Sequence, residues 1–211
     1  MGPLKVAIVD DNDESRETLR DELEEYNFVP EPLLGPFQTV GSLVDAVRAK
    51  ADVAICDHHL IANYAGFDGA EAVASLYERQ LPAVLVTAWS KAELQEIQPF
   101  RRHIPVLLTP QEAEIERIAR GWDVCRQEFM GQFLPSRRPW QTLVQIEDID
   151  GEDVFVTLPG WRSDEVIRLP KGAIKKDLQR YVKPGERFFA MVNKGAEQQA
   201  DLFFEDFQYR V

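Results

Sequence analysis

The stretch that decides the fold is Lys5-Val6-Ala7-Ile8-Val9-Asp10-Asp11, an apolar run of strand length that ends abruptly in acidic residues. Continuous apolar runs are typical of strands that are buried on both faces of a sheet. Later runs with the same form cover 51–56, 83–86 and 104–108, and they end at Asp57, Thr87 and Thr109. We therefore expect a sheet whose inner strands are covered on both sides.

Helical patterns lie between these runs. Apolar residues recur at helical spacing within 14–26, 40–47, 69–80, 90–98 and 115–129. Residues 28–34 form a broken extended stretch, and Pro30 and Pro32 make it at best an edge strand. Strands that alternate with helices in this way predict a doubly wound parallel α/β sheet with helices on both faces.

The pattern changes after residue 130. Gly, two Pro and two Arg within 131–139 indicate a linker, and strand-like runs separated by turn signals follow it. These runs are 142–149, 153–158, 165–169, 187–193 and 201–209, with a short helix expected at 172–181. The prediction is an α/β domain over 1–130, a linker over 131–139, and a small all-β domain over 140–211. An OB-like or SH3-like barrel would suit the last of these.

Composition narrows the class of protein. The chain has 211 residues and a formal net charge of −12, and 13 basic and 23 acidic residues fall within 1–137. Such an acidic chain is not expected to bind duplex DNA generally. No apolar run approaches a membrane span, and no secretory signal is expected at the N-terminus. Cys56 and Cys125 lie in apolar surroundings, which predicts buried thiols in a cytoplasmic protein.

Three carboxylates are expected to meet at one edge of the sheet. Asp10 and Asp11 follow one strand and Asp57 ends another, and ligands of parallel sheets bind beyond the carboxyl ends of the strands. Carboxylates gathered in this way repel one another unless a cation neutralises them, and hard oxygen ligands favour Mg²⁺. A carboxylate beside such a metal is a competent phosphoryl acceptor.

The order of these motifs resembles the receiver domain of two-component response regulators over about residues 4–130. The resemblance rests on Val9-Asp10-Asp11, Asp57, Gly66-Phe67-Asp68-Gly69 and Val86-Thr87-Ala88. It implies a flavodoxin-like (βα)5 fold and a phosphoryl group accepted on Asp57 from a sensor histidine kinase or phosphotransfer protein. It further implies that Asp10, Asp11, Asp57 and the backbone carbonyl of His59 hold Mg²⁺, and that Thr87 hydrogen-bonds the phosphoryl group.

Three features depart from that family. Thr109 precedes Pro110 where the family has a Lys, and a threonine cannot supply the charge with which that Lys pairs the phosphoryl oxygens. Val106 replaces a usual aromatic residue, and the loop after Asp57 is longer and lacks Met-Pro. The metal-binding half of the site is thus kept while the switch half is altered. Arg101 or Arg102 is a candidate substitute cation.

Two other functions stay open for this region. The missing Lys favours a degenerate receiver that acts as a scaffold without being phosphorylated. Asp57-His58-His59 matches the signature of DHH phosphoesterases, in which such residues bind a transition metal. In the receiver interpretation, His58 and Trp89 are expected at the rim of the phosphorylation site.

The all-β domain is expected to be the output. It shows no helix-turn-helix pattern and no acid/base pair, so we expect neither transcription control nor enzymatic activity. One segment of it is rich in cations, with Arg168, Lys171, Lys175, Lys176, Arg180, Lys183 and Arg187, and the first five are the candidate output surface. A protein partner is the favoured ligand for this segment, and nucleic acid is the alternative. Phosphorylation is expected to reposition the output domain or to create a homodimer surface.

Overall fold

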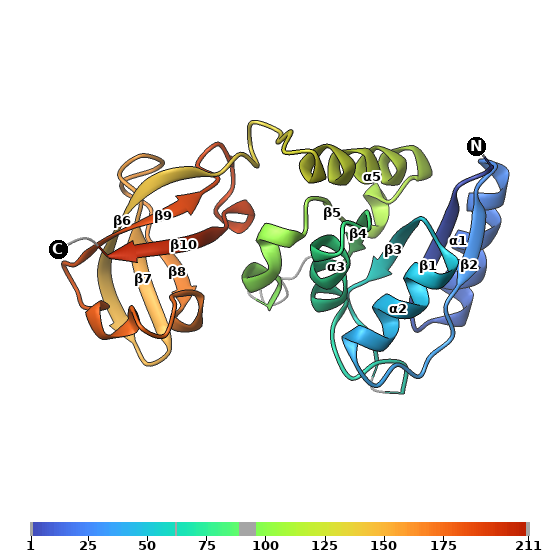
Figure 1. Ribbon diagram of the computed structural model, residues 1–211, viewed down its shortest axis with the longest axis horizontal. Helices are drawn as coiled ribbons and strands as arrows, with labels where there is room; N and C mark the ends of the chain where they lie inside the picture. The colour runs from blue at the N-terminus through green and yellow to red at the C-terminus, as the bar shows by residue number, and fades with distance from the viewer. Residues whose placement is uncertain (1, 62, 89–95, 210–211) are drawn as a thin grey trace. The chain divides into compact units, whose positions relative to one another are not determined.

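The computed structural model describes residues 2–61, 63–88 and 96–209, which form two compact units. The first unit comprises residues 1–93 and 103–132, and the second comprises 94–102 and 133–211. Each unit has its own sheet, as Figure 1 shows.

The first unit is the predicted parallel α/β fold. Its sheet has the strand order β2-β1-β3-β4-β5, and every neighbouring pair is parallel. β2 lies at one edge, as its two prolines predicted. In chain order the elements are β1 (Lys5–Val9), α1 (Asp13–Glu25), β2 (Val29–Pro32), α2 (Val40–Lys50), β3 (Val53–Asp57), α3 (Gly69–Glu78), β4 (Ala83–Val86), η1 (Gln98–His103), β5 (Leu107–Leu108), η2 (Pro110–Glu112) and α5 (Ile115–Phe129). Of the helix predicted at 90–98, residues 90–95 lie outside the described residues.

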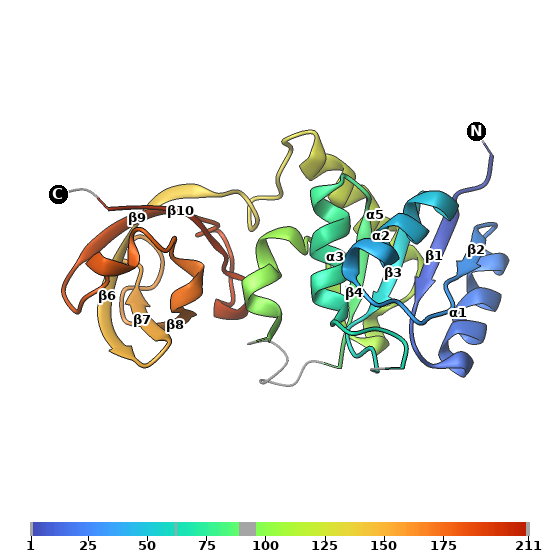
Figure 2. The ribbon, with the colours of Figure 1, turned by 60° about the horizontal axis from the view of Figure 1, so that its bottom comes forward.

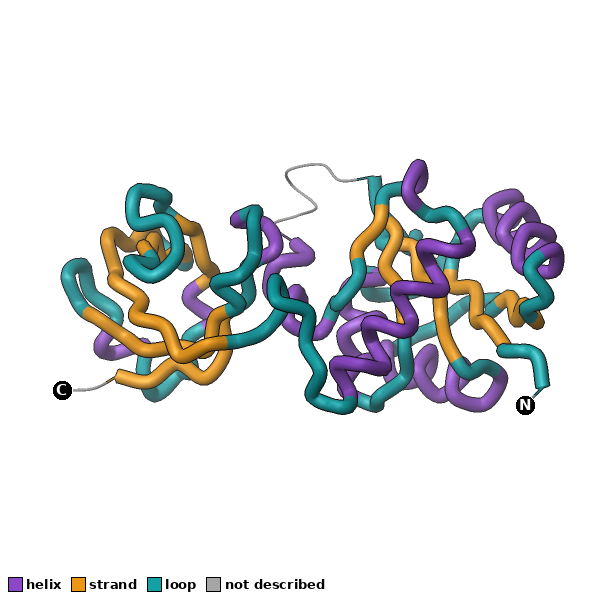
Figure 3. Tube along the Cα trace, turned by 90° about the horizontal axis from the view of Figure 1, so that it is seen from above, coloured by secondary structure: helices purple, strands orange, loops and turns teal. Residues whose placement is uncertain are grey.

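Helices lie on both sides of this sheet (Figures 2 and 3). On one side, Trp122 of α5 packs in a cluster with Ile8 and Ile55 and donates a hydrogen bond of 3.0 Å from its indole nitrogen to the Ala54 carbonyl. Alternate residues of the same strands, such as Cys56, are equally buried. Burial on both faces explains why the strands read as continuous apolar runs.

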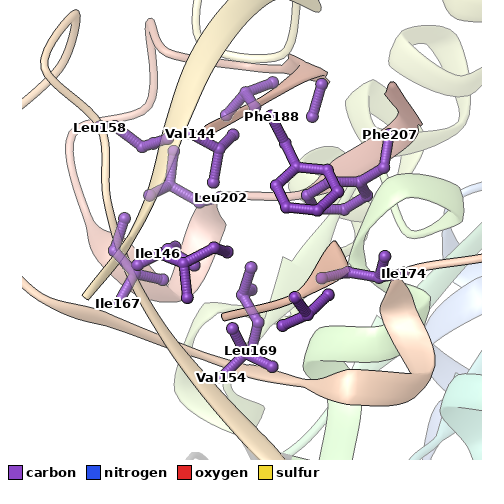
Figure 4. Packing of buried hydrophobic residues seen from close by; sticks show 14 of the residues in the cluster. Val144, Ile146, Val154, Leu158, Ile167, Leu169, Ile174, Phe188, Leu202 and Phe207 are labelled. Atoms are coloured by element: carbon purple, nitrogen blue, oxygen red, sulfur yellow. The ribbon is translucent and has the colours of Figure 1, made fainter. Parts of the chain in front are cut away.

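The second unit is an all-β domain, in agreement with the prediction. Its five strands are antiparallel in the order β10-β9-β6-β7-β8. They are β6 (Trp140–Asp150), β7 (Asp153–Thr157), β8 (Ile167–Pro170), β9 (Arg187–Val192) and β10 (Phe204–Tyr209), with short 3-10 helices η3 (Lys171–Ala173), η4 (Gln179–Tyr181) and η5 (Gln199–Asp201). Inward-facing residues from these strands fill a single core, in which Phe188 and Phe207 meet edge to face at 6.4 Å (Figure 4).

The prediction of a short helix at 172–181 is wrong. Two separate 3-10 turns, η3 and η4, take its place. The Gln179 side chain donates hydrogen bonds to the carbonyls of Lys171 and Ile174, at 3.1 and 2.9 Å, so those carbonyls are satisfied without α-helical bonds. A side chain that competes for backbone groups in this way replaces the helix.

Residues 133–139, predicted as part of a linker, pack into the second unit. Arg137 is buried, and the Asn193 side chain donates a 3.0 Å hydrogen bond to the Ser136 carbonyl. The sequence suggested a linker because Gly and Pro are common there, but the polar backbone of this segment has partners within the unit. Residues 96–102, which the sequence placed in the first domain, also pack with the second unit.

We predict that Gly195→Ala destabilises the second unit by about 2–3 kcal/mol, a cost typical of overpacking. A Cβ atom at Gly195 would lie 2.2 Å from the Pro135 carbonyl oxygen, which is backbone and cannot move aside easily. Denaturant unfolding of the full chain measures the loss. Gly172→Ala is the control, because its Cβ would meet open space. Equal unfolding midpoints for the two variants would contradict the predicted role of this close approach.

Candidate functional site

The parallel sheet brings Asp10 and Asp57 to the same edge. β1 and β3 are neighbours in register, with Val9 opposite Cys56, so the residues that follow both strands lie side by side. Thr87 directly follows the adjacent strand β4 and is buried, with its backbone N–H donating to the Leu108 carbonyl at 2.9 Å. The strand ends thus position the predicted acceptor, its acidic neighbour and the predicted phosphoryl ligand along one edge.

The negative charges of the carboxylates at this edge of the sheet are only partly compensated by neighbouring groups. Burial, followed by the neighbouring Asp10 carboxylate, raises the pKa of Asp57 to about 6. The backbone N–H of His58 and the nearby His59 only partly oppose this rise. Burial also raises the pKa of Asp10, with Asp11 adding to the effect. The trio therefore interacts electrostatically in the way that the sequence predicted.

The chemistry of this trio suits a hard divalent cation. The Asn12 backbone N–H donates to Asp10 Oδ1 at 2.7 Å, and the Ile61 backbone N–H donates to Asp11 Oδ2 at 3.3 Å, which leaves a second oxygen on each carboxylate. As they stand, the described side chains include no group of three or more His, Cys, Asp or Glu residues close enough to hold a metal ion. A cation at this edge would therefore have to draw the carboxylates together.

Arg16 is a buried cation beside the site that sequence reasoning missed. Its guanidinium donates to the Asp10 backbone carbonyl and to the Asp13 carboxylate, and it lies 5.9 Å from the Tyr64 ring. Asn12 caps α1 by accepting from the Ser15 backbone N–H at 3.0 Å. The position of Arg16, one turn after this capping residue, was the available signal for a cation near the strand ends.

Thr109 caps a short helix. Its backbone N–H and its hydroxyl both donate to Glu112 Oε2, at 3.0 and 3.1 Å, at the start of η2. These bonds, with the partner Arg117, lower the pKa of Glu112. The side chain that replaces the family's Lys is thus bonded to a carboxylate, which is consistent with capping and not with a substitute for a cation.

Of four other predicted residues, the structure describes Arg101, Arg102 and His58. Arg101 and Arg102 are wrong as substitutes for the Lys, because both form ion pairs within the second unit, with Asp201 and Glu205. His58 is almost completely buried, so its placement at the rim is wrong. His59 is exposed, with its ring centroid 5.0 Å from that of His58. Trp89 lies outside the described residues.

The long loop after Asp57 is ordered by its packing against the connection between β2 and α2. The Tyr64 hydroxyl donates to the Leu33 carbonyl at 2.7 Å, and the Phe37 backbone N–H donates to the Tyr64 carbonyl at the same distance. At its far end the loop requires Gly69, because a Cβ there would lie 1.9 Å from the Asp57 carbonyl oxygen. The loop is longer than in the receiver family, but the close approach of Gly69 still holds the backbone of Asp57 against the start of α3.

A cavity of about 520 Å³ opens beside the acidic residues. Asp10 and Asp57 line it together with polar residues of α1, and Ile55 and Val86 are among its apolar lining residues. A volume of this size admits a small molecule or a protruding side chain of a partner. The Asp57 carboxyl is accordingly reachable although it is partly buried.

The predicted basic surface of the second unit is interrupted by acids. Arg168 pairs with Asp153 at 2.7 Å, and Lys175 lies 3.7 Å from Asp206. Arg180 stacks over the Tyr181 ring at 4.7 Å. Lys171 and Lys176 complete the segment, and its cations are thus mixed with neutralising and aromatic partners. The cations of this segment therefore do not form an uninterrupted basic stripe of the kind that binds phosphates.

The first unit has structural relatives. It resembles receiver domains of response regulators. The Francisella response regulator 1452 receiver domain is 16% identical (TM-score 0.44; 60% of this chain and 98% of that chain covered). A putative response regulator from Chloroflexus aurantiacus is 19% identical (0.45; 58% and 98%). The signal receiver domain of an HD domain-containing protein from Pseudomonas fluorescens is 13% identical (0.48; 62% and 94%).

No protein-family model and no curated protein sequence matches the chain. The second unit is not assigned by the structural relatives, which cover the N-terminal part. Among the described helices, none has the length and apolar character that crossing a membrane requires.

We predict that Asp57→Asn raises the free energy of unfolding at pH 7 by about 1–2 kcal/mol. This figure follows from the raised pKa of Asp57, reduced for partial solvent screening. Because the folded-state pKa of Asp57, about 6, exceeds its ordinary value of 3.8, the wild type loses stability as the pH rises through that range. The difference in unfolding free energy between Asp57→Asn and the wild type should therefore vanish near pH 4 and reach a constant value above pH 6. Urea unfolding across this range measures it.

Asp68→Asn serves as the control for this experiment. Asp68 is an exposed carboxylate in the same loop and makes no side-chain hydrogen bond at the start of α3. Its replacement removes one charge from the same loop without touching the acidic edge, so it should not reproduce the gain expected of Asp57→Asn. A stabilisation by Asp57→Asn that stays constant from pH 4 to pH 8 would show that the charge of Asp57 is not its source.

Proposed function

We propose that the protein is a two-component response regulator that accepts a phosphoryl group on Asp57. The observation that carries this proposal is the partly buried Asp57 carboxylate at the end of β3, beside Asp10 and next to the end of β4. Carboxylates at such a site can bind a divalent cation, and an oxygen of Asp57 can then attack a phosphoryl group. The motif order at the strand ends supports the same function.

In the proposed reaction, a carboxylate oxygen of Asp57 attacks the phosphorus atom of a phosphohistidine on a sensor histidine kinase or phosphotransfer protein. The new P–O bond forms as the P–N bond breaks, and the electron pair returns to the histidine nitrogen of the donor. Mg²⁺, when bound, supplies charge neutralisation for this transfer. Asp10, Asp11, Asp57 and the His59 backbone carbonyl would hold it, and the Thr87 hydroxyl would donate a hydrogen bond to the product.

The second unit is the proposed output. Its core is closed and well packed, and its cations are interleaved with acids, which favours a protein partner over nucleic acid. We propose no catalytic activity for this unit, in line with the absence of an acid/base pair in its sequence. A homodimer formed after phosphorylation is part of the same proposal. The acceptor step occurs in the cytoplasm, where sensor kinases present their phosphohistidine.

A degenerate receiver is the second candidate, and one observation favours it. The residue at the position that the family gives to Lys is Thr109, and its hydroxyl is bonded to Glu112. A protein of this kind would use its folded first unit as a scaffold. The DHH phosphoesterase alternative is less favoured, because the side chain of His58, one of its proposed metal ligands, is buried.

We predict that incubation with acetyl phosphate and Mg²⁺ adds the mass of one phosphoryl group to the protein. Asp57→Ala should abolish the adduct, because it removes the attacking oxygen, whereas Asp68→Ala should keep it. Intact-mass spectrometry at short incubation times provides the measurement. A wild type that never acquires the adduct, with either a small donor or a phosphorylated kinase domain, would establish the scaffold instead.

Thr109→Lys should increase the phosphorylation rate by about tenfold or more, because a charge-assisted hydrogen bond to the phosphoryl oxygens is worth roughly 1.5–3 kcal/mol. Thr109→Ala is the control: it removes the same bonds to Glu112 without adding a cation. Time courses of adduct formation compare the three proteins. Equal rates for the Lys and Ala variants would show that position 109 does not face the phosphoryl group.

A further inference from the structure

A second cavity of the first unit lies where the parallel strands begin, at the end of the sheet opposite Asp57. Its volume is about 650 Å³. The described residues that line it come from the chain leading into β1, from the connection between α2 and β3, and from the last turn of α5. β1 and β3 are parallel neighbours, so their first residues lie side by side at this end of the sheet. The cavity is therefore built entirely within one unit.

Four cations meet in the lining of this cavity. They are Lys5, Arg48, Lys50 and Arg126. The first unit has only 10 basic residues against 22 acidic ones, so this one cavity collects four of its ten cations. A strongly acidic unit thus carries a basic cavity at the end of its sheet that is remote from the carboxylates.

The acid among the lining residues is engaged by the backbone. Asp52 Oδ2 accepts a 2.9 Å hydrogen bond from the Lys5 backbone N–H, and the Asp52 backbone N–H donates to the Lys5 carbonyl at the same distance. These bonds fix the starts of β1 and β3 against each other. Within the described part of the chain, the side chains of Lys5, Arg48 and Lys50 form no ion pair. Their charges are available to a ligand.

The ends of two helices account for only part of this positive charge. The carbonyl end of a helix is equivalent to about half a negative charge, so the ends of α2 and α5 together offset about one cation. Arg126 also pairs with Asp123 at 3.0 Å, but their side chains are 40% and 67% exposed, and such a pair contributes little. Four cations less Asp52 and Asp123 leave a formal charge of +2. A positive surplus therefore remains after the helix ends are counted.

The chemistry of these cations suits phosphoryl oxygens. A guanidinium group donates two parallel hydrogen bonds to a phosphoryl group, and an ammonium group places a compact charge beside it. The cations come from three separate segments around a cavity whose volume is typical of small-molecule sites, so they can contact several linked phosphoryl groups at once. The other described lining residues are Gly2, Pro3, Leu4, Ala49 and Ala51. None of these described residues is aromatic, so they offer no ring on which a nucleobase would stack.

We propose that this cavity binds a polyphosphate chain, either free or as the phosphate part of a nucleotide, through Lys5, Arg48, Lys50 and Arg126. The groups recognised are the phosphoryl oxygens and not a base. Because the cavity and Asp57 lie at opposite ends of the strands, binding requires neither phosphorylation nor Mg²⁺ at the acidic edge. The site goes beyond the proposed function, and either can fail without the other.

Calorimetric titration of the full chain with inorganic tripolyphosphate, in a buffer of low ionic strength without Mg²⁺, tests the site. The wild type should bind, and Arg48→Gln/Lys50→Gln should weaken binding by about tenfold or more, because charge-assisted hydrogen bonds are lost. The matched control is Arg20→Gln/Arg79→Gln, which removes two cations of the same unit that contact Asp21 and Ser75 outside the cavity. Equal losses in the two double variants, or a wild type that does not bind, would overturn the proposal.

The recognised group is tested by exchanging the ligand. Tripolyphosphate should bind about tenfold or more tightly than orthophosphate, because more of its oxygens meet cations. ATP that binds as tightly as tripolyphosphate identifies nucleotides as a source of the chain, and ATP that binds more weakly identifies the free chain. Binding of adenosine, or a clear preference between ATP and GTP, would show that a base is recognised and would contradict the assignment. A glutamate-rich peptide or anionic vesicles that bind where tripolyphosphate does not would also contradict it.

Acetylation of lysines in the wild type locates the ligand without any variant. At a tripolyphosphate concentration about tenfold above Kd, the free site falls about tenfold, so acetylation of Lys5 and Lys50 should slow by about that factor. Lys176, an exposed lysine of the second unit, should react at an unchanged rate. Equal protection of Lys176 would mean that the anion binds lysines indiscriminately, and the site would be refuted.

Discussion

Repulsion among carboxylates at the end of a buried parallel sheet is the constraint on which the rest of the first unit depends. The parallel pairing of β1 with β3 forces Asp10 and Asp57 to be neighbours, and burial strengthens their repulsion. A protein evolved only for stability would place neutral residues there, because an unpaired buried charge costs free energy. The chain instead tolerates a carboxyl whose pKa has moved to about 6, which is typical of sites that bind a cation or form a bond.

The surrounding structure stabilises this edge through backbone contacts. The N–H groups of Asn12 and Ile61 donate to Asp10 and Asp11, and the close approach of Gly69 to the Asp57 carbonyl fixes the start of α3. These interactions set the positions of the acids without neutralising them. The carboxylates therefore still repel one another, and a bound divalent cation would relieve that repulsion.

Periodicity sufficed to predict most of the fold. Continuous apolar runs identified four strands of the first sheet, and two prolines in a broken extended stretch identified its edge strand β2. Alternation identified all five strands of the second sheet. The helix predicted at 172–181 failed because the Gln179 side chain satisfies the carbonyls of Lys171 and Ile174, a tertiary detail that spacing does not reveal. The segment at 133–139 looked like a linker because composition reports the need for turns and not the hydrogen-bond partners of the backbone.

The sequence predicted where the acidic residues of the candidate site lie, but it did not predict where the arginines lie. Strand ends place carboxylates by topology, but the long side chain of an arginine can reach in many directions. Arg16 turned back to the Asp10 carbonyl, whereas Arg101 and Arg102 pair with Asp201 and Glu205, which lie about 100 residues further along the chain. Pairings over such a separation leave no periodic trace in one sequence.

The destination of these two arginines changes the charge of both units. With residues 94–102 counted in the second unit, the first has 10 basic and 22 acidic residues, and the second has 14 of each. The whole net charge of −12 therefore resides in the unit that contains the acidic edge. A field of one sign attracts cations and positively charged partner surfaces and accelerates their encounter. Because Arg101 and Arg102 form their ion pairs with acids of the second unit, that unit is neutral by formal charge, and the acidic excess of the first unit comes entirely from its own residues.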